Sequence, residues 1–311
     1  MALDPQAKAL LESAEQSGAP PFNAYPAAEA RAVYDQASEL VRGNPPESHS
    51  IDAIVIPGPA GAIPAWVYKP SAEQNLPVLV YFHGGGYTIG SLKSHDCVCR
   101  GLCIEANCIV VSVDYRLAPE NKYPAAVDDA WAAAQWAASN AESLGGNPNN
   151  VAIGGDSAGG NLTAVVSLLA KESGNPYFVF QLLIYPGTDM SCSFESHKTF
   201  GQGYRLTNEL IDWFYDHYFS KDDDLSHWKA SPLNAEDLSG LPSAFVLSAG
   251  YDPLQDENRA YAEKLTSAGV KVKHSHYEGM MHGFVTMPGV IDKAKTAISE
   301  CAAELRQAFQ N

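Results

Sequence analysis

The alternation of short apolar runs with longer amphipathic runs is the feature that most restricts the fold of this chain. From residue 108 onward, runs with helical periodicity separate five apolar runs, at 108–116, 150–157, 178–187, 243–252 and 270–279. Strands that are connected through helices lie parallel, and the helices bury both faces of the sheet. The sequence therefore predicts an α/β fold built on a mostly parallel sheet.

Three further β-rich runs precede this region, at 51–57, 63–70 and 76–82. They bring the expected sheet to eight strands. Glycine and proline separate these runs, as is typical of strand boundaries.

Two segments do not follow the alternation. Residues 1–50 contain two helical patterns, around 7–17 and 27–42, and the stretch 188–241 contains the aromatic run NELIDWFYDHYF but no clear strand. A stretch of that length without a strand is usually functional. We expect these two segments to form a helical cap over a catalytic domain of residues 51–311, with 188–241 as an insertion in that domain.

Charge and the N-terminal pattern restrict the partners. A formal net charge of -16 disfavours binding to nucleic acid and to anionic lipid surfaces, and suits neutral or cationic small molecules. The first eighteen residues lack the basic and apolar regions of a secretory signal, and no run is long enough to span a membrane. We therefore expect a cytoplasmic protein without integral membrane association.

Four of the six cysteines, Cys97, Cys99, Cys103 and Cys108, fall in one short segment near His95. Their spacings do not repeat the paired C-x2-C pattern of structural zinc sites. Apolar neighbours favour buried, reduced thiols. We expect neither a metal site nor a cofactor.

The strongest chemical signal is Gly155-Asp156-Ser157-Ala158-Gly159, between an apolar run and a helical one. In this context the serine lies on a sharp strand-to-helix turn with unfavourable backbone angles, and the glycines give the turn room. The motif predicts Ser157 as an exposed nucleophile.

A second signal is the glycine-rich segment from His83 to Tyr87, HGGGY, at the end of the run 76–82. Backbone N–H groups of such a loop, together with that of Ala158, can stabilise the oxyanion of an acyl-transfer reaction. A phosphate-binding loop is the alternative, but neither G-x-x-x-x-G-K nor G-x-G-x-x-G occurs here.

A serine nucleophile of this kind needs an acid and then a histidine later in the chain. Asp252 ends the run 243–252, and His282 follows the last run in the loop EGMMHGF. We assign these two residues as the orienting acid and the general base. The rival acids are Asp256, Asp189 and Glu278, and the rival bases are His274, His276, His197, His217 and His227.

Together these motifs resemble the hormone-sensitive-lipase-like family of α/β-hydrolases, in particular its microbial esterases and arylacetamide-deacetylase-like members. The resemblance runs from about Leu76 to the C-terminus. It rests on HGGGY (83–87), DYRLAPENKYPAAVDD (114–129), GDSAGG (155–160), YDPLQDE (251–257) and MHGF (281–284).

The resemblance implies an α/β-hydrolase fold with a helical cap, whose insertion follows the sixth strand. It also implies a triad of Ser157, Asp252 and His282. The implied oxyanion hole consists of the amides of Gly85, Gly86 and Ala158, with Gly84 able to replace either of the other glycines. The implied activity is a serine carboxylesterase that hydrolyses short- to medium-chain acyl esters through an acyl-enzyme, without a cofactor.

Two other functions stay open at this point. One is an arylamide deacetylase or amidase that uses the same triad. The other is a non-catalytic receptor, because plant gibberellin receptors resemble this family but have lost the catalytic histidine; the presence of His282 argues against it. The natural substrate and the oligomeric state stay open too, and a homodimer is one candidate.

The remaining motif residues have structural interpretations. By the same resemblance, His83 braces the glycine loop. For Arg116, Glu120 and Asp128 we favour a structural polar network over binding of the substrate. A further set of residues is either pocket lining or plain core: Tyr87, Tyr185, Trp213, Phe214 and Met281.

Overall fold

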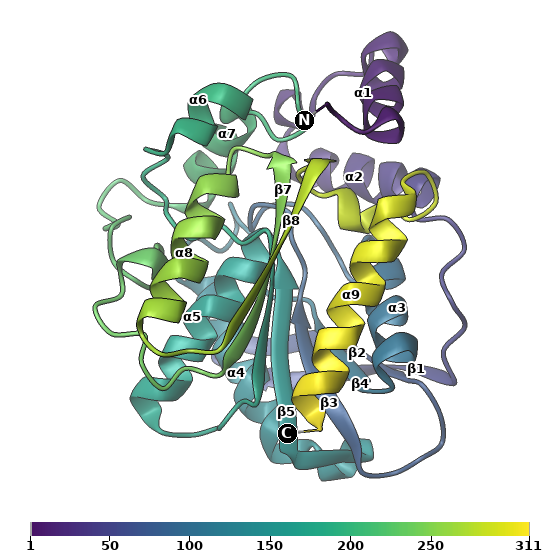
Figure 1. Ribbon diagram of the computed structural model, residues 1–311, viewed down its shortest axis with the longest axis vertical. Coiled ribbons are helices and arrows are strands. Elements are labelled where there is room, and N and C mark those ends of the chain that lie inside the picture. Colours follow the sequence, from purple (N-terminus) through teal and green to yellow (C-terminus); the bar gives the residue numbers. More distant parts are fainter. Residues whose placement is uncertain (1, 311) are drawn as a thin grey trace.

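The structure, a computed structural model, describes residues 2–310 and contains one eight-stranded sheet (Figure 1). The strand order is β1-β2-β4-β3-β5-β6-β7-β8. Strand β2 is antiparallel to β1 and to β4, and all other neighbours are parallel. The strands are β1 Ser50–Gly58, β2 Gly61–Lys69, β3 Leu76–Phe82, β4 Ile109–Val113, β5 Gly146–Asp156, β6 Phe180–Ile184, β7 Ser243–Tyr251 and β8 Val272–Met281. The predicted α/β architecture with a mostly parallel sheet of eight strands is confirmed.

Helices cover both faces of this sheet, as the apolar sequences of the central strands require. In β3, every residue from Val78 to Phe82 is fully buried. Helices α3 and α9 pack on one face and α4, α5 and α8 on the other (Figure 1). These helices are α3 Asp96–Ala106, α4 Ala125–Asn140, α5 Ala158–Ser173, α8 Gln255–Ser267 and α9 Asp292–Phe309.

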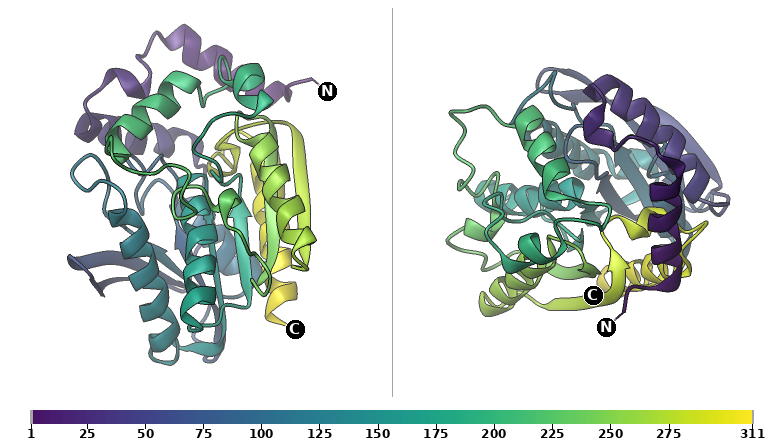
Figure 2. Two further views of the ribbon diagram at one scale, coloured as in Figure 1. Left: turned by 90° about the vertical axis from the view of Figure 1, so that its left-hand side faces the viewer. Right: turned by 90° about the horizontal axis from the view of Figure 1, so that it is seen from above.

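The helices of the N-terminal segment and those of the insertion after β6 gather at the end of the molecule where β7 and β8 terminate (Figures 1 and 2). The N-terminal segment contains α1 (Pro5–Ser17) and α2 (Ala27–Val41), and the insertion contains α6 (Glu195–Phe200) and α7 (Asn208–Tyr218). Ala30 of α2 and Phe214 of α7 belong to one apolar cluster. The two segments that interrupt the alternation therefore pack against each other beside the carboxyl ends of the strands.

The boundary between the amphipathic run 124–145 and the apolar run 150–157 differs from the one that the sequence pattern indicates. The run 124–145 ends its α-helix at Asn140 and continues as a short 3-10 turn, Glu142–Leu144. Gly145 then adopts a left-handed φ of +87°, which ends the 3-10 turn. Strand β5 begins directly afterwards, at Gly146, four residues before the apolar run.

The clustered cysteines are buried and free, as predicted. Burial raises the pKa of the Cys97 and Cys103 thiols to about 12. Within residues 2–310, no group of three or more His, Cys, Asp or Glu side chains is placed to hold a metal ion. In the same range, a membrane-crossing helix of sufficient length and apolarity is not found.

Candidate active site

Ser157 lies on the sharp turn between β5 and α5. Its backbone has φ +55° and ψ -118°, a strained combination for a residue with a side chain. The flanking glycines are required by close backbone approach, because a Cβ on Gly159 would lie 1.9 Å from the Phe82 oxygen. A Cβ on Gly155 would lie 2.4 Å from the Gly159 oxygen. The motif thus makes the strand–turn–helix expected from the sequence.

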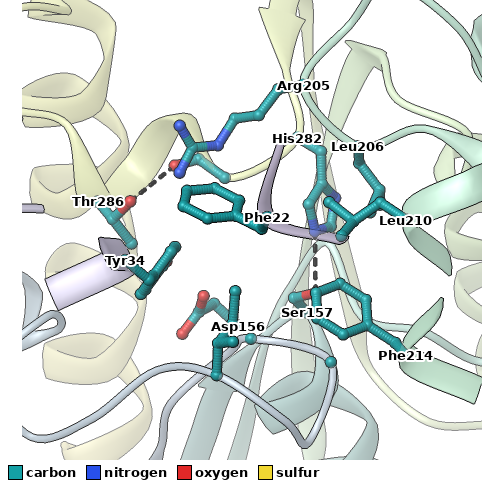
Figure 3. Close-up of a pocket in the computed structure, with 14 residues that line it drawn as sticks. Phe22, Tyr34, Asp156, Ser157, Arg205, Leu206, Leu210, Phe214, His282 and Thr286 are labelled. Carbon is teal, nitrogen blue, oxygen red and sulfur yellow. Dashed lines mark hydrogen bonds between the residues drawn. The ribbon is translucent and has the colours of Figure 1, made fainter. Parts of the chain in front are cut away.

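The structure brings Ser157, His282 and Asp252 together from three strand ends. The Ser157 hydroxyl lies 2.8 Å from His282 Nε2, and His282 Nδ1 lies 2.7 Å from Asp252 Oδ2 (Figure 3 shows the first contact). Asp252 is fully buried and its other carboxylate oxygen accepts the Leu254 amide at 2.9 Å. With a proton on Nδ1, the histidine donates to the aspartate and accepts from the serine.

Apart from Glu278, the rival acids and bases are engaged elsewhere. Asp256 accepts the Ser196 amide and pairs with Arg259. His274 and His276 both contact the Ser248 hydroxyl, each at 2.8 Å. Further from the turn, Asp189 binds Ser191, His197 pairs with Glu257, His217 contacts the Trp213 carbonyl and His227 accepts the Lys229 amide. Among the described residues, His282 is the histidine that contacts Ser157.

The glycine loop after β3 faces the same turn. Gly85 and Gly86 have φ values of +121° and +57°, and a Cβ on either would lie 2.2 Å from a neighbouring atom, the Ile89 oxygen or the Phe214 ring. Within residues 2–310, the amides of Gly85 and Gly86 have no hydrogen-bond acceptor. Both glycines and Ser157 line one cavity. The loop can therefore present free N–H groups to an oxyanion that forms next to Ser157.

Asp156 braces this loop, a role that sequence reasoning missed. Its carboxylate accepts hydrogen bonds from the Tyr81 hydroxyl (2.8 Å) and the Gly84 amide (3.0 Å), and it contacts His95 Nε2 at 3.2 Å. Burial alone would raise the pKa of Asp156, but His95 and the hydrogen bonds outweigh it and lower this pKa. A charged carboxylate thus ties the residue before Ser157 to the glycine loop. Asp156 is part of the motif at residues 155–159. The direction of its side chain depends on the packing of β3 and α3, which the motif does not encode.

His83 is buried beneath the same loop, consistent with the bracing role that the resemblance implies. Its Nδ1 donates to the Gly84 carbonyl at 2.8 Å, and its ring stacks on Tyr115 with centroids 4.4 Å apart. Burial, and next the charge of His95, lower the pKa of His83 to about 4. The ring is therefore neutral near pH 7.

Because the buried His83 ring is neutral, its protonation should make the folded protein less stable in mild acid. The unfolded chain takes up this proton near pH 6.5, whereas the folded chain takes it up only near pH 4. The contribution of His83 to stability is complete above pH 6.5 and is lost as the pH falls from 6.5 to 4, by up to about 3 kcal/mol. Denaturant unfolding across this window should show the loss. We expect His83→Gln to flatten the dependence of the free energy of unfolding on pH, and the exposed control His49→Gln to leave it as in the wild type. The same dependence in both variants would contradict this assignment.

Two cavities meet at Ser157. The first has about 510 Å³ of space, part of it open to solvent, and His282 lines it. The second has about 410 Å³, also partly open to solvent, and His282 does not line it. The first is lined by Phe22, Tyr34, Gly85, Gly86, Ile89, Asp156, Ser157, Arg205, Leu206, Leu210, Phe214, His282, Gly283 and Thr286 (Figure 3). The second is lined by Gly86, Tyr87, Ser157, Ala158, Gly187, Met190, Leu206, Ile211, Phe214, Tyr215 and Leu254.

From the sequence, five residues are assigned either to the pocket lining or to the core. The structure places some of them in each group. Phe214 lines both cavities and Tyr87 lines the second. Tyr185, Trp213 and Met281 line neither; the Tyr185 ring packs on His282 with centroids 4.7 Å apart.

Arg116 and Glu120 make ion pairs within the fold, but not with each other or with Asp128. Arg116 binds Asp129 with two hydrogen bonds of 2.7 and 2.8 Å, because Asp129 lies on the buried side of α4. Glu120 pairs instead with Arg31 of α2. These are two separate ion pairs, and the second one fastens the N-terminal segment to the loop before α4.

Comparison with known proteins gives a consistent result. Residues 79–286 match the model of a family described as α/β hydrolase fold. The carboxylic ester hydrolase LipN of Mycobacterium tuberculosis is 47% identical over 249 residues, which are 78% of this chain and 66% of LipN. The ethyl acetate hydrolase of Pseudomonas putida is 35% identical over 99% of both chains.

A solved structure is similar over nearly the whole chain. The ester hydrolase EH1AB1 from the metagenome of Lake Arreo, in complex with a bipyridine phosphonate derivative, has a TM-score of 0.96 and is 41% identical. The superposition covers 99% of this chain and 100% of that one.

Proposed function

Because this chain belongs to the α/β-hydrolase fold family, we propose that it is a serine carboxylesterase with Ser157 as nucleophile, His282 as general base and Asp252 as the residue that orients the histidine. The observation that carries the proposal is the hydrogen-bonded chain from Ser157 through His282 to Asp252, next to the free amides of the glycine loop. The relatives named as ester hydrolases favour an ester over an amide substrate.

The reaction follows from this arrangement. His282 Nε2 takes the proton as Ser157 Oγ attacks the acyl carbon, and the negative oxygen is held by the amides of Gly85, Gly86 and Ala158. His282 then gives its proton to the alcohol oxygen, the C–O bond breaks, and an acyl-enzyme remains. His282 next takes a proton from water as the water oxygen attacks the acyl carbon. The bond between that carbon and Ser157 Oγ breaks, His282 returns the proton to Oγ, and the acid leaves. Asp252 stabilises the imidazolium in both steps.

The leaving alcohol must receive its proton from His282 and therefore lies on the His282 side. That side is the first cavity, whereas the second cavity does not include His282. We assign the second cavity, with its apolar Met190, Ile211 and Leu254, to the acyl chain.

The organisation of the chain is part of the proposal. Residues 1–50 and the insertion 188–241 act as a cap over the catalytic domain of residues 51–311. Support comes from Phe22 and Tyr34 of the first segment and Arg205 and Phe214 of the second, which line one cavity with Ser157. A cytoplasmic location and a homodimer are further expectations, and size-exclusion chromatography with light scattering tests the homodimer.

The cap over the mouth of the site should limit the length of the acyl chain. On a series of p-nitrophenyl esters from acetate to palmitate, kcat/KM should peak well below about twelve carbons, because the cap residues Ile211 and Phe214 form part of the wall of the second cavity. Met190→Ala should move the peak to longer chains by removing a wall, whereas the exposed Leu40→Ala should not. A rate that rises sharply once the substrate passes its solubility limit would instead indicate an interfacial lipase.

A further inference from the structure

Arg205 is a cation in the wall of the first cavity. It comes from the insertion, between α6 and α7, and lies across the pocket from Ser157 and Asp156 (Figure 3). Its φ of +53° is in the left-handed region, where a residue with a side chain is strained. No other arginine or lysine lines either cavity.

Arg205 also lacks a carboxylate partner among residues 2–310. Among the described residues, four of the other six arginine side chains pair with carboxylates, whereas Arg42 and Arg306 do not. These pairs are Arg31–Glu120, Arg100–Asp96, Arg116–Asp129 and Arg259–Asp256. The charge of Arg205 is therefore not used by an ion pair of the fold.

The polar groups around Arg205 leave its donors available. Tyr34 is the side chain with which it interacts: burial raises the pKa of the Tyr34 hydroxyl, and the positive charge and hydrogen bond of Arg205 oppose this rise. The other charged group of the wall, Asp156, is already bound by Tyr81, Gly84 and His95. A guanidinium has five N–H donors, so several remain for a ligand.

We propose that Arg205 determines specificity by binding an anionic group, such as a carboxylate, on the alcohol part of the ester. The inference rests on the proposed function, because the leaving alcohol is assigned to the cavity that His282 and Arg205 share. Arginine binds carboxylates with two parallel hydrogen bonds, and a partly enclosed site strengthens them. The substrate class is thus an ester whose alcohol carries a negative charge, although the whole protein is acidic.

The test compares two esters that differ only in charge. (4-Acetoxyphenyl)acetate and its primary amide have the same shape, and the methylene group keeps the two phenol leaving groups similar. We expect Arg205→Leu to lower kcat/KM for the carboxylate about 10- to 100-fold, mainly through KM, and to change that for the amide less than about twofold. Arg205→Lys should keep part of the preference, because it retains the charge without the planar fork.

Lys198→Met is the matched control, because it removes an exposed cation of the same insertion that lies outside both cavities. It should leave the ratio of kcat/KM for the carboxylate ester to kcat/KM for the amide ester unchanged. The proposal is overturned if Arg205→Leu leaves this ratio unchanged, or if it lowers both rates equally. Failure of the wild-type protein to hydrolyse the neutral amide-bearing ester would count against the proposed esterase function instead.

Discussion

Replacement of Ser157 by alanine should lower kcat for an ester by about 10⁵-fold or more, the scale that loss of the nucleophile has in other serine hydrolases. The hydroxyl is the group that His282 deprotonates, and no neighbouring side chain of the described residues can take its place at the turn. What remains should be the weak catalysis of the free amides and of substrate positioning. Steady-state kinetics on a short-chain p-nitrophenyl ester measures the loss.

Ser248→Ala is the matched control for this variant. Ser248 is a second buried serine in contact with histidines, His274 and His276, but it lies within β7, away from the glycine loop. It should keep near wild-type kcat. Activity that survives in Ser157→Ala and disappears in Ser248→Ala would show that the nucleophile has been misassigned.

Asp252→Asn should lower kcat at least about a hundredfold, with KM little changed. An amide of the same size removes the charge that stabilises the imidazolium, and it can donate to Nδ1 and so favour the wrong tautomer. The corresponding change in the chymotrypsin-type triad costs about 10⁴ in kcat. In this chain Asp252 is fully buried at 2.7 Å from His282 Nδ1, so water cannot easily replace the lost interaction.

Asp256→Asn is the matched control for Asp252→Asn. Asp256 is in the same short stretch, but it belongs to α8, where it accepts the Ser196 amide and pairs with the exposed Arg259. Its replacement should change stability slightly and kcat little. An inactive Asp256→Asn together with a fully active, folded Asp252→Asn would reverse the assignment.

The fold was predictable because strand and helix runs in this chain differ strongly in pattern. In the apolar run 76–82, every residue from Val78 to Phe82 is fully buried, as a central parallel strand requires. The contact of Ser157, Asp252 and His282 was predictable because each follows a strand of the parallel sheet, and those strand ends meet at one edge.

Other features depend on side-chain directions that a single sequence does not encode. Asp128 and Asp129 are neighbours in one helix, and only the packing of α4 decides that Asp129 meets Arg116. The brace from Asp156 to Gly84 joins residues 72 positions apart through the parallel contact of β3 and β5. Arg205 is one polar residue in an irregular stretch, and its place in the cavity follows from the left-handed turn that carries it.

The net charge of the chain does not predict the local charge of the cavity. A net charge of -16 describes the average surface and led to the expectation of neutral or cationic substrates. The cavity beside Ser157 has a different local charge, because Arg205 is unpaired there and Asp156 is bound by its neighbours. Local charge in the cavity, rather than the sum over the chain, should set the preference for the alcohol.

Covalent labelling with a fluorophosphonate, followed by peptide mass spectrometry, tests the central claim most directly. The probe reacts with serine hydroxyl groups that an adjacent base activates. We expect one adduct per chain, on Ser157, formed in proportion to the loss of esterase activity and absent from Ser157→Ala. An adduct on another residue that accounts for the inactivation, or equal labelling of Ser157→Ala, would contradict the assignment of Ser157 as the nucleophile.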